Sequence, residues 1–151
     1  MAGLPWAITT GGEVALTAAA TKTMLQSTAP ANQRVQLNGF TVSFQGVSPT
    51  AEQIIVRIAR QTTAGTMTAV TPVKDDDSLP ETIQSTAQKN ATVEPTTTDV
   101  LREFYVHPQG GYERVFGPKE IMIKGGGRLG LIVITPTGVN PDCVATMSCE
   151  E

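Results

Sequence analysis

Cysteine and histidine are scarce in this sequence, and their scarcity limits the sites that the chain can build. Its 151 residues include two cysteines and one histidine, His107. Two cysteines cannot complete a zinc site alone, and a single histidine excludes a zinc site with several histidine ligands. One cysteine pair also falls short of the dense disulfide framework of small secreted domains. We therefore expect neither a metal ion nor another cofactor in this protein.

Long apolar runs and an excess of positive charge are missing as well. No apolar run approaches the ~20 residues that a membrane-spanning helix requires, and the first residues lack the basic region and apolar stretch of a secretory leader. The net charge is -3, and the eleven basic residues are scattered along the sequence, without the local patch that nucleic-acid binding needs. We expect a soluble protein, made in a cytoplasm, that contacts neither membranes nor nucleic acids.

Signatures of catalysis are equally few. Any Ser-His-Asp or Cys-His arrangement must use His107, which lies beside Pro108 at the end of a predicted strand, and no nucleophile-elbow motif is present. Glycosidases need two carboxylates across a cleft, usually with aromatic platforms, whereas aromatic residues make up only 5% of this chain. We therefore predict that the chain has no catalytic residues and is not an enzyme.

The residues that are abundant point to short strands joined by turns. The chain holds 14 glycines and 10 prolines together with many threonines. Threonine favours strands, and glycine and proline favour the turns between them. A chain of this length usually forms one domain with its own hydrophobic core. The composition therefore favours a single all-β domain.

Alternation of apolar and polar residues locates the strands. The clearest run is 53–61, which places Ile54, Val56 and Ile58 on one face. Within 34–44 the alternation changes parity after Gly39, where we expect a β-bulge or a bend. The other expected strands lie within 14–27, 67–73, 91–94, 100–107, 112–116, 120–124, 128–135 and 143–149. Seven to nine short strands with turns between them predict a single antiparallel β-sandwich or jelly roll.

The first dozen residues follow no sustained period. Residues 1–12 contain Pro5 and a lone Trp6, so we expect an extended N-terminal arm, followed by a jelly-roll domain over residues 13–151. Tryptophan buries a large area where proteins meet. The arm residues Leu4, Pro5 and Trp6 are therefore predicted to bind a partner, and the alternative that Trp6 packs on its own domain stays open.

Three short motifs suggest ligands or modification, and each has a simpler explanation. Gly125–Gly130 matches the G-x-G-x-x-G pattern of dinucleotide-binding loops, but that loop must open a helix and a β-rich run follows here. Asp75–Asp77 lacks the spacing of a calcium-binding EF-hand. The sequon Asn90–Thr92 is of a kind that arises by chance in a threonine-rich stretch. We expect a tight turn, a solvated loop and an unmodified asparagine.

The two cysteines lie in one predicted strand. Cys143 and Cys149 have the same parity, and six residues at ~3.3 Å each would separate their Cα atoms by ~20 Å. A disulfide tolerates only ~4.4 to 6.8 Å between Cα atoms. We therefore predict that these cysteines are not bonded to each other within one chain.

Two segments resemble small virion proteins of tailed bacteriophages. They are His107-Pro-Gln-Gly-Gly-Tyr-Glu-Arg-Val-Phe and Ile121-Met-Ile-Lys-Gly-Gly-Gly-Arg-Leu-Gly-Leu. The chain is similar, over roughly residues 50–138, to the head decoration (cement) proteins of the jelly-roll type. The likeness lies in the style and order of the residues.

The resemblance implies a structural virion protein on the capsid surface. Such a protein forms a homotrimer, binds the major capsid protein on the outside of the head and stabilises contacts between capsid subunits. It is synthesised in the host cytoplasm. We expect the contacts between copies to include Tyr105, His107 and Tyr112. The alternatives are a carbohydrate- or receptor-binding jelly-roll domain of a phage fibre, and a hydrolase whose carboxylates meet only in the fold.

Overall fold

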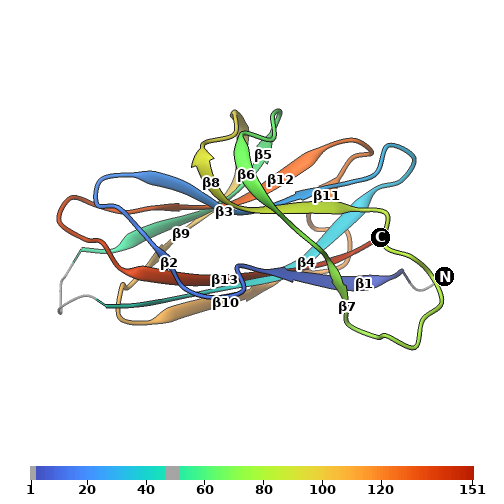
Figure 1. Ribbon diagram of the computed structural model, residues 1–151, viewed down its shortest axis with the longest axis horizontal. Coiled ribbons are helices and arrows are strands. Elements are labelled where there is room, and N and C mark those ends of the chain that lie inside the picture. The colour runs from blue at the N-terminus through green and yellow to red at the C-terminus, as the bar shows by residue number, and fades with distance from the viewer. Residues whose placement is uncertain (1–2, 47–51) are drawn as a thin grey trace.

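Two antiparallel β-sheets pack face to face in the computed structural model, which describes residues 3–46 and 52–151 (Figure 1). The strands are β1 (Pro5–Thr9), β2 (Val14–Ala15), β3 (Thr21–Thr28), β4 (Val35–Gln45), β5 (Ile54–Gln61), β6 (Thr66–Val70), β7 (Val73–Lys74), β8 (Thr86–Val93), β9 (Thr97–Val106), β10 (Gly111–Val115), β11 (Met122–Ile123), β12 (Arg128–Ile134) and β13 (Asp142–Glu150). The described residues form no helix, hence none long and apolar enough to cross a membrane. The predicted all-β sandwich is confirmed.

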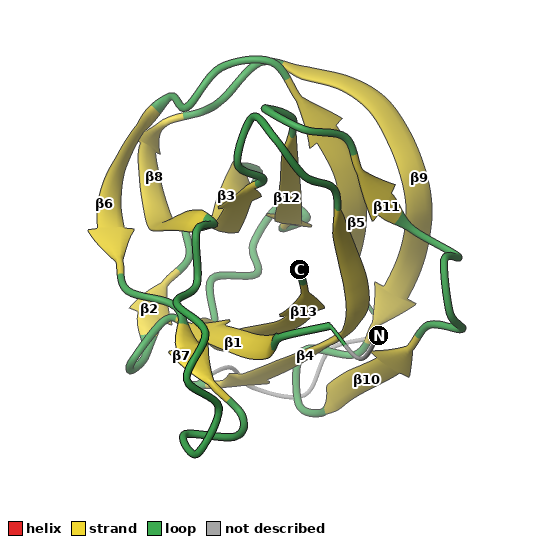
Figure 2. Ribbon diagram, turned by 90° about the vertical axis from the view of Figure 1, so that its right-hand side faces the viewer, coloured by secondary structure: helices red, strands yellow, loops and turns green. Residues whose placement is uncertain are grey.

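The two sheets differ in strand order. Sheet A has seven strands in the order β10-β4-β13-β1-β7, with β11 beside β4 and β2 beside β13. Sheet B has six strands in the order β6-β8-β3-β12-β5-β9. Figure 2 shows the sheets closing around the core, with β9 and β10 on one side and β6 and β7 on the opposite side.

The strand pairing is nested. The first strand, β1, pairs with the last, β13, and β3 pairs with the next-to-last, β12. Further in, β4 pairs with β10, and β5 pairs with β9. The segment from β6 to β8 is an insertion between β5 and β9: β8 and β6 extend sheet B beyond β3, and β7 adds an edge strand to sheet A beside β1. In the sequence, each pair of strands therefore encloses the next pair.

Most predicted strands are found close to their expected places. The runs 53–61, 100–107, 128–135 and 143–149 correspond to β5, β9, β12 and β13. The expected strand 91–94 is the end of a longer one, β8, and the expected strand 120–124 is reduced to the two residues of β11. The parity change near Gly39 is also confirmed, because the register between β4 and β13 shifts between Ser148 and Cys149, which pair with Gly39 and Leu37.

The N-terminal segment is part of the sandwich, which corrects the expected arm. Strand β1 is hydrogen-bonded to β13 on one side and to β7 on the other. Leu4 and Trp6 are buried, at 7% and 0% exposure, and Pro5 is half-buried. The physical reason is a period of two: Leu4, Trp6 and Ile8 alternate with smaller residues and enter the core. Residues 1 and 2 of the predicted arm lie outside the described residues.

Candidate functional site

Edge strands β9 and β10 meet on one side of the sandwich and carry the predicted contact residues. The ring of Tyr112 packs 4.9 Å from the ring of Phe104, centre to centre, and so joins the two edges. Tyr112 is half-buried, whereas Tyr105 is 71% exposed on the outer face of sheet B. His107 is exposed in the turn after β9. The fold therefore places Tyr105 and His107 at the surface and uses Tyr112 mainly for packing.

Tyr105 belongs to a row of apolar side chains across the outer face of sheet B. The register places Ile55 opposite Tyr105 and Ile134 opposite Ile55. Both isoleucines are half-buried. Neighbouring residues across strands contact each other on one face of a sheet. We call these three residues the outer apolar row, and its exposed end is Tyr105.

The turn containing His107 is held by its own backbone. The Gly110 amide donates to the His107 carbonyl oxygen at 3.0 Å, and the Gln109 amide donates to His107 Nδ1 at 3.2 Å. Because His107 Nδ1 accepts a backbone N–H, this nitrogen takes part in holding the turn.

Glu120 fastens the segment after β10 to both edge strands. Its carboxylate accepts the Gly117 amide at 2.8 Å and the Arg102 guanidinium at 3.2 Å. These donors hold the pKa of Glu120 below its usual value, the Gly117 hydrogen bond being the larger cause and Arg102 the next. The Arg114 guanidinium lies over the Phe116 ring at 5.6 Å. The charged residues here therefore serve the structure of the β9/β10 side.

Two of the three short motifs, the glycine-rich segment and the aspartate run, have the simpler structures that we expected. The glycine-rich segment forms a tight turn that leads into strand β12, not into a helix. Gly126 has a φ of 72°, and a Cβ at Gly125 would lie 2.5 Å from the Ala31 carbonyl oxygen, so both positions need glycine. Asp75–Asp77 lies in an exposed loop where Asp76 accepts the Ser78 amide at 3.0 Å. Within the described ranges, no group of His, Cys, Asp and Glu side chains could hold a metal ion.

Both cysteines lie on the inner face of β13 as free thiols, so their predicted placement in one strand is confirmed. Each side chain is buried in the core. Burial raises the pKa of Cys143 and of Cys149 to about 12, because a thiolate loses its hydration inside the protein. A buried, protonated thiol is a poor nucleophile. These residues therefore act as small apolar core residues.

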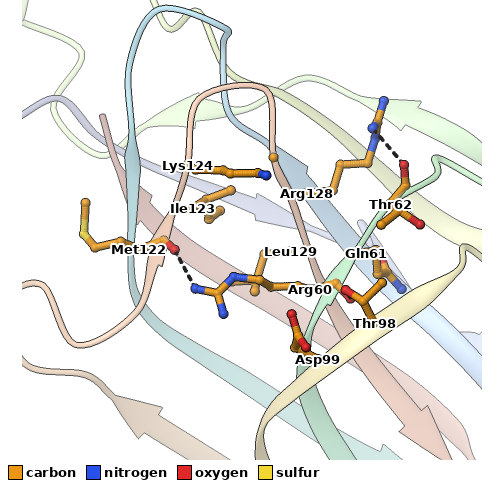
Figure 3. Close-up of a pocket in the computed structure, with 11 residues that line it drawn as sticks. Arg60, Gln61, Thr62, Thr98, Asp99, Met122, Ile123, Lys124, Arg128 and Leu129 are labelled. Carbon is orange, nitrogen blue, oxygen red and sulfur yellow. Dashed lines mark hydrogen bonds between the residues drawn. The ribbon is translucent and has the colours of Figure 1, made fainter.

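A pocket that the sequence did not reveal lies where β5, β11 and β12 come together. It is a hollow of about 140 Å³ lined by Arg60, Lys124 and Arg128, with Asp99 also on its wall. Figure 3 shows these side chains around the hollow. We call it the basic pocket. In the sequence, Arg60 lies far from Lys124 and Arg128. The pairing of β12 with β5 brings Arg128 opposite Gln61, the residue after Arg60.

The basic side chains of this pocket have weak partners. Arg60 Nη2 donates to the Met122 carbonyl oxygen at 3.4 Å, and Arg128 Nη1 donates to the Thr62 carbonyl oxygen at 3.5 Å. The ion pairs found among the described residues involve other arginines. Arg128 Nε is buried and has no hydrogen-bond partner there. Among the described residues, no carboxylate therefore lies within ion-pair distance of these side chains, although Asp99 lines the same pocket.

Comparisons with known proteins add no relative to this picture. No family model, curated protein or solved structure matches the chain. Its function is therefore argued from the position and chemistry of its own residues.

Proposed function

We propose that this chain is a structural virion protein, a decoration protein that binds the outside of a phage head. It contacts the major capsid protein there and stabilises the junctions between neighbouring capsid subunits. The nested strand pairing supports a jelly roll as the specific type of β-sandwich. A jelly roll is a double-sheet arrangement of eight strands in two Greek keys. Jelly rolls are common in viral capsid proteins and in lectins.

The observation that carries this proposal is the location of the residues that resemble decoration proteins. Residues 107–116 form the exposed turn after β9 and the edge strand β10. An edge strand leaves backbone groups unpaired on one side, where another chain can bind. Beside this edge, Val115 is 70% exposed and Tyr105 is 71% exposed. Large exposed apolar side chains beside an open sheet edge favour a protein contact.

A homotrimer fits this arrangement of the edges. The outer apolar row ends at Tyr105, and His107 is exposed two residues further along the chain. Contact between copies through these residues would cover the exposed tyrosine and leave the opposite side, with β6 and β7, free for other contacts. Three linked copies would raise the apparent affinity for a capsid without new contact chemistry.

The alternative is a carbohydrate- or receptor-binding domain. One observation favours it: Tyr105 is the one exposed aromatic residue within 3–46 and 52–151, and with Ile55, Glu103 and Phe104 it lines a small hollow of about 80 Å³. An aromatic ring beside a carboxylate is a suitable combination for a sugar, since the ring covers its apolar face and the carboxylate accepts hydrogen bonds from its hydroxyl groups.

Sedimentation with capsids tests the proposal. The purified chain is mixed with capsids assembled from the major capsid protein of the same genome, and the bound fraction is measured against concentration. We expect saturable binding, and a light-scattering mass of three times the chain mass of 15.9 kDa. The Tyr105→Glu variant places a charge at the end of the outer apolar row and should weaken capsid binding by about tenfold or more.

The control variant is Thr86→Glu, which adds the same charge to an exposed position on β8, at the end of sheet B away from β9. It should bind as the unmodified chain does. A strictly monomeric chain that does not sediment with capsids would overturn the proposal. Saturable binding to a host-surface polysaccharide, lost in Tyr105→Glu, would instead establish the carbohydrate-binding alternative.

A further inference from the structure

The basic pocket draws its positive charge from three separate segments. Arg60 lies near the end of β5, Lys124 lies in the turn after β11, and Arg128 begins β12. Figure 3 shows Lys124 above Arg60 and Asp99 below it, with the Arg60 guanidinium directed toward Met122 and the Arg128 guanidinium directed toward Thr62. Arg60 and Lys124 bring two positive charges to one hollow of about 140 Å³, and Asp99 on its wall offsets only part of that charge.

These basic residues lie close together although the net charge of the whole chain is -3. Among the described residues no carboxylate lies within ion-pair distance of Arg60, Lys124 or Arg128, although Asp99 lines the same hollow. The Lys124 ammonium makes no hydrogen bond in that part of the chain, and the buried Arg128 Nε also has no partner. A buried donor without an acceptor costs free energy. An incoming oxygen acceptor would remove that cost.

The backbone around Lys124 is fixed before any ligand arrives. The Gly127 amide donates to the Lys124 carbonyl oxygen at 2.8 Å, and the Gly126 amide donates to the Pro30 carbonyl oxygen at 3.1 Å. The Ala29 amide in turn donates to the Gly127 carbonyl oxygen at 3.0 Å. Because this turn is tied to the segment before β4, the position of Lys124 is preorganised, and preorganisation lowers the cost of binding.

We infer that the basic pocket binds a single oxyanion group, a phosphate or a carboxylate. Guanidinium and ammonium groups form charge-assisted hydrogen bonds with such oxygens. The size of the hollow suits one group, and Asp99 on its wall disfavours a second negative charge nearby. The group can come from a free ion or from a side chain of a partner protein. This inference goes beyond the proposed function and does not depend on it.

Titration calorimetry of the whole chain at low salt tests the inference. The probes are inorganic phosphate, acetate and a short triglutamate peptide. We expect one binding site per chain that weakens as salt is added, because salt screens charge interactions at an open pocket. Lys124→Gln should weaken binding about tenfold. Its matched control, Lys74→Gln, removes the same charge from β7 at the far edge of sheet A and should leave the affinity unchanged.

A second variant, Arg60→Gln, keeps the test valid if Lys124→Gln impairs folding. It should also weaken binding about tenfold while thermal unfolding stays near that of the unmodified chain. Tighter binding of triglutamate than of either free ion indicates a partner carboxylate, and tightest binding of phosphate indicates a phosphate ligand. Equal affinities in Lys124→Gln and Lys74→Gln, or no heat with any of the three probes, would overturn the inference. These outcomes do not involve capsids, so they are distinct from failure of the proposed function.

Discussion

The two sheets of this sandwich bury their strands in different ways. In sheet A, strand β13 alternates buried and half-buried residues along its whole length, so only the inner face is covered. In sheet B, the middle residues of β3 and β12 are buried on both faces. Alternation is the pattern of a sheet with one solvated face, and its loss indicates a sheet covered on both sides.

Two turns cover the outer face of sheet B. They are residues 62–65 and 94–96, which we call the strap, and Figure 1 shows them on the side of sheet B away from sheet A. They are joined by a hydrogen bond from the Thr62 amide to the Thr96 carbonyl oxygen at 2.9 Å. The strap is itself polar. A sheet face can therefore be buried by a loop as well as by a second sheet.

Polar side chains beneath the strap hydrogen-bond with one another. Gln26 Nε2 donates to Gln61 Oε1 at 2.7 Å and to the Thr63 carbonyl oxygen at 3.0 Å. Gln61 Nε2 donates to Thr23 Oγ1 at 3.1 Å, and Thr23 Oγ1 donates to the Glu94 carboxylate at 2.6 Å. Burial of polar groups is tolerated where they are paired. Sheet A gains stability from apolar packing on one face, whereas sheet B adds a polar network on the other.

The largest expected effect comes from the buried face of sheet A. Trp6→Ala removes a side chain with 0% exposure from the core and should lower the free energy of unfolding by about 3–5 kcal/mol, measured by urea denaturation. Tyr105→Ala is the matched control: it removes an aromatic ring that is 71% exposed and should change stability by less than about 0.5 kcal/mol. A negligible cost for Trp6→Ala would restore the free arm that we first expected.

The polar network of sheet B gives the next largest effect. Gln26→Ala leaves Gln61 Oε1 and the Thr63 carbonyl oxygen without their donor and should cost about 2 kcal/mol. Gln45→Ala, an exposed glutamine at the end of β4 in sheet A, should cost less than about 0.5 kcal/mol. Denaturant midpoints of the two variants measure the difference. Equal midpoints would mean that the buried Gln26 contributes no more to stability than the exposed Gln45.

Clean alternation of apolar and polar residues explains which strands the sequence predicts most clearly. The run 143–149 and the face of Ile54, Val56 and Ile58 alternate cleanly, and both strands were predicted. The strand of Trp6 was missed because Pro5 and the nearby glycines obscured the alternation of Leu4, Trp6 and Ile8. Local patterns predict strands well where turn residues do not interrupt them.

The strap and the basic pocket depend on contacts between distant residues. Gln26 and Gln61 meet across β12, which lies between their strands in sheet B. Arg60 and Arg128 meet only because β12 pairs with β5. No local pattern in the sequence reveals the order of the strands in sheet B. Neither the buried glutamines nor the cluster of cations could therefore be predicted from the sequence.

The thiols of sheet A make stability depend on alkaline pH. The unfolded thiols have a pKa near 9.0, and burial raises the pKa of both folded thiols to about 12. Above pH 9 the unfolded chain binds fewer protons than the folded chain, so stability falls as pH rises, by about 1.4 kcal/mol per pH unit for each thiol. Urea denaturation from about pH 8 to about pH 11 should show this slope.

The control for the alkaline slope is the double variant Cys143→Ala and Cys149→Ala. It has lost both thiols, so its stability should fall less steeply above pH 9 even if it is less stable at neutral pH. Identical slopes for the variant and the unmodified chain would mean that the thiols are ionised in the fold, against their burial.

The smallest expected effect tests how closely the polar network packs against the backbone of sheet B at Gly130. A Cβ at Gly130 would lie 2.5 Å from Gln61 Oε1, so Gly130→Ala must displace the side chain that accepts from Gln26. The displacement should disappear when Gln61 is already an alanine. A double-mutant cycle of Gly130→Ala and Gln61→Ala should therefore give a coupling free energy of about 1 kcal/mol, with the double variant more stable than the sum of the single changes predicts. Strict additivity of the two changes would show that Gln61 moves aside without cost, and that the polar network beneath the strap is looser than the packing on the inner face of sheet A.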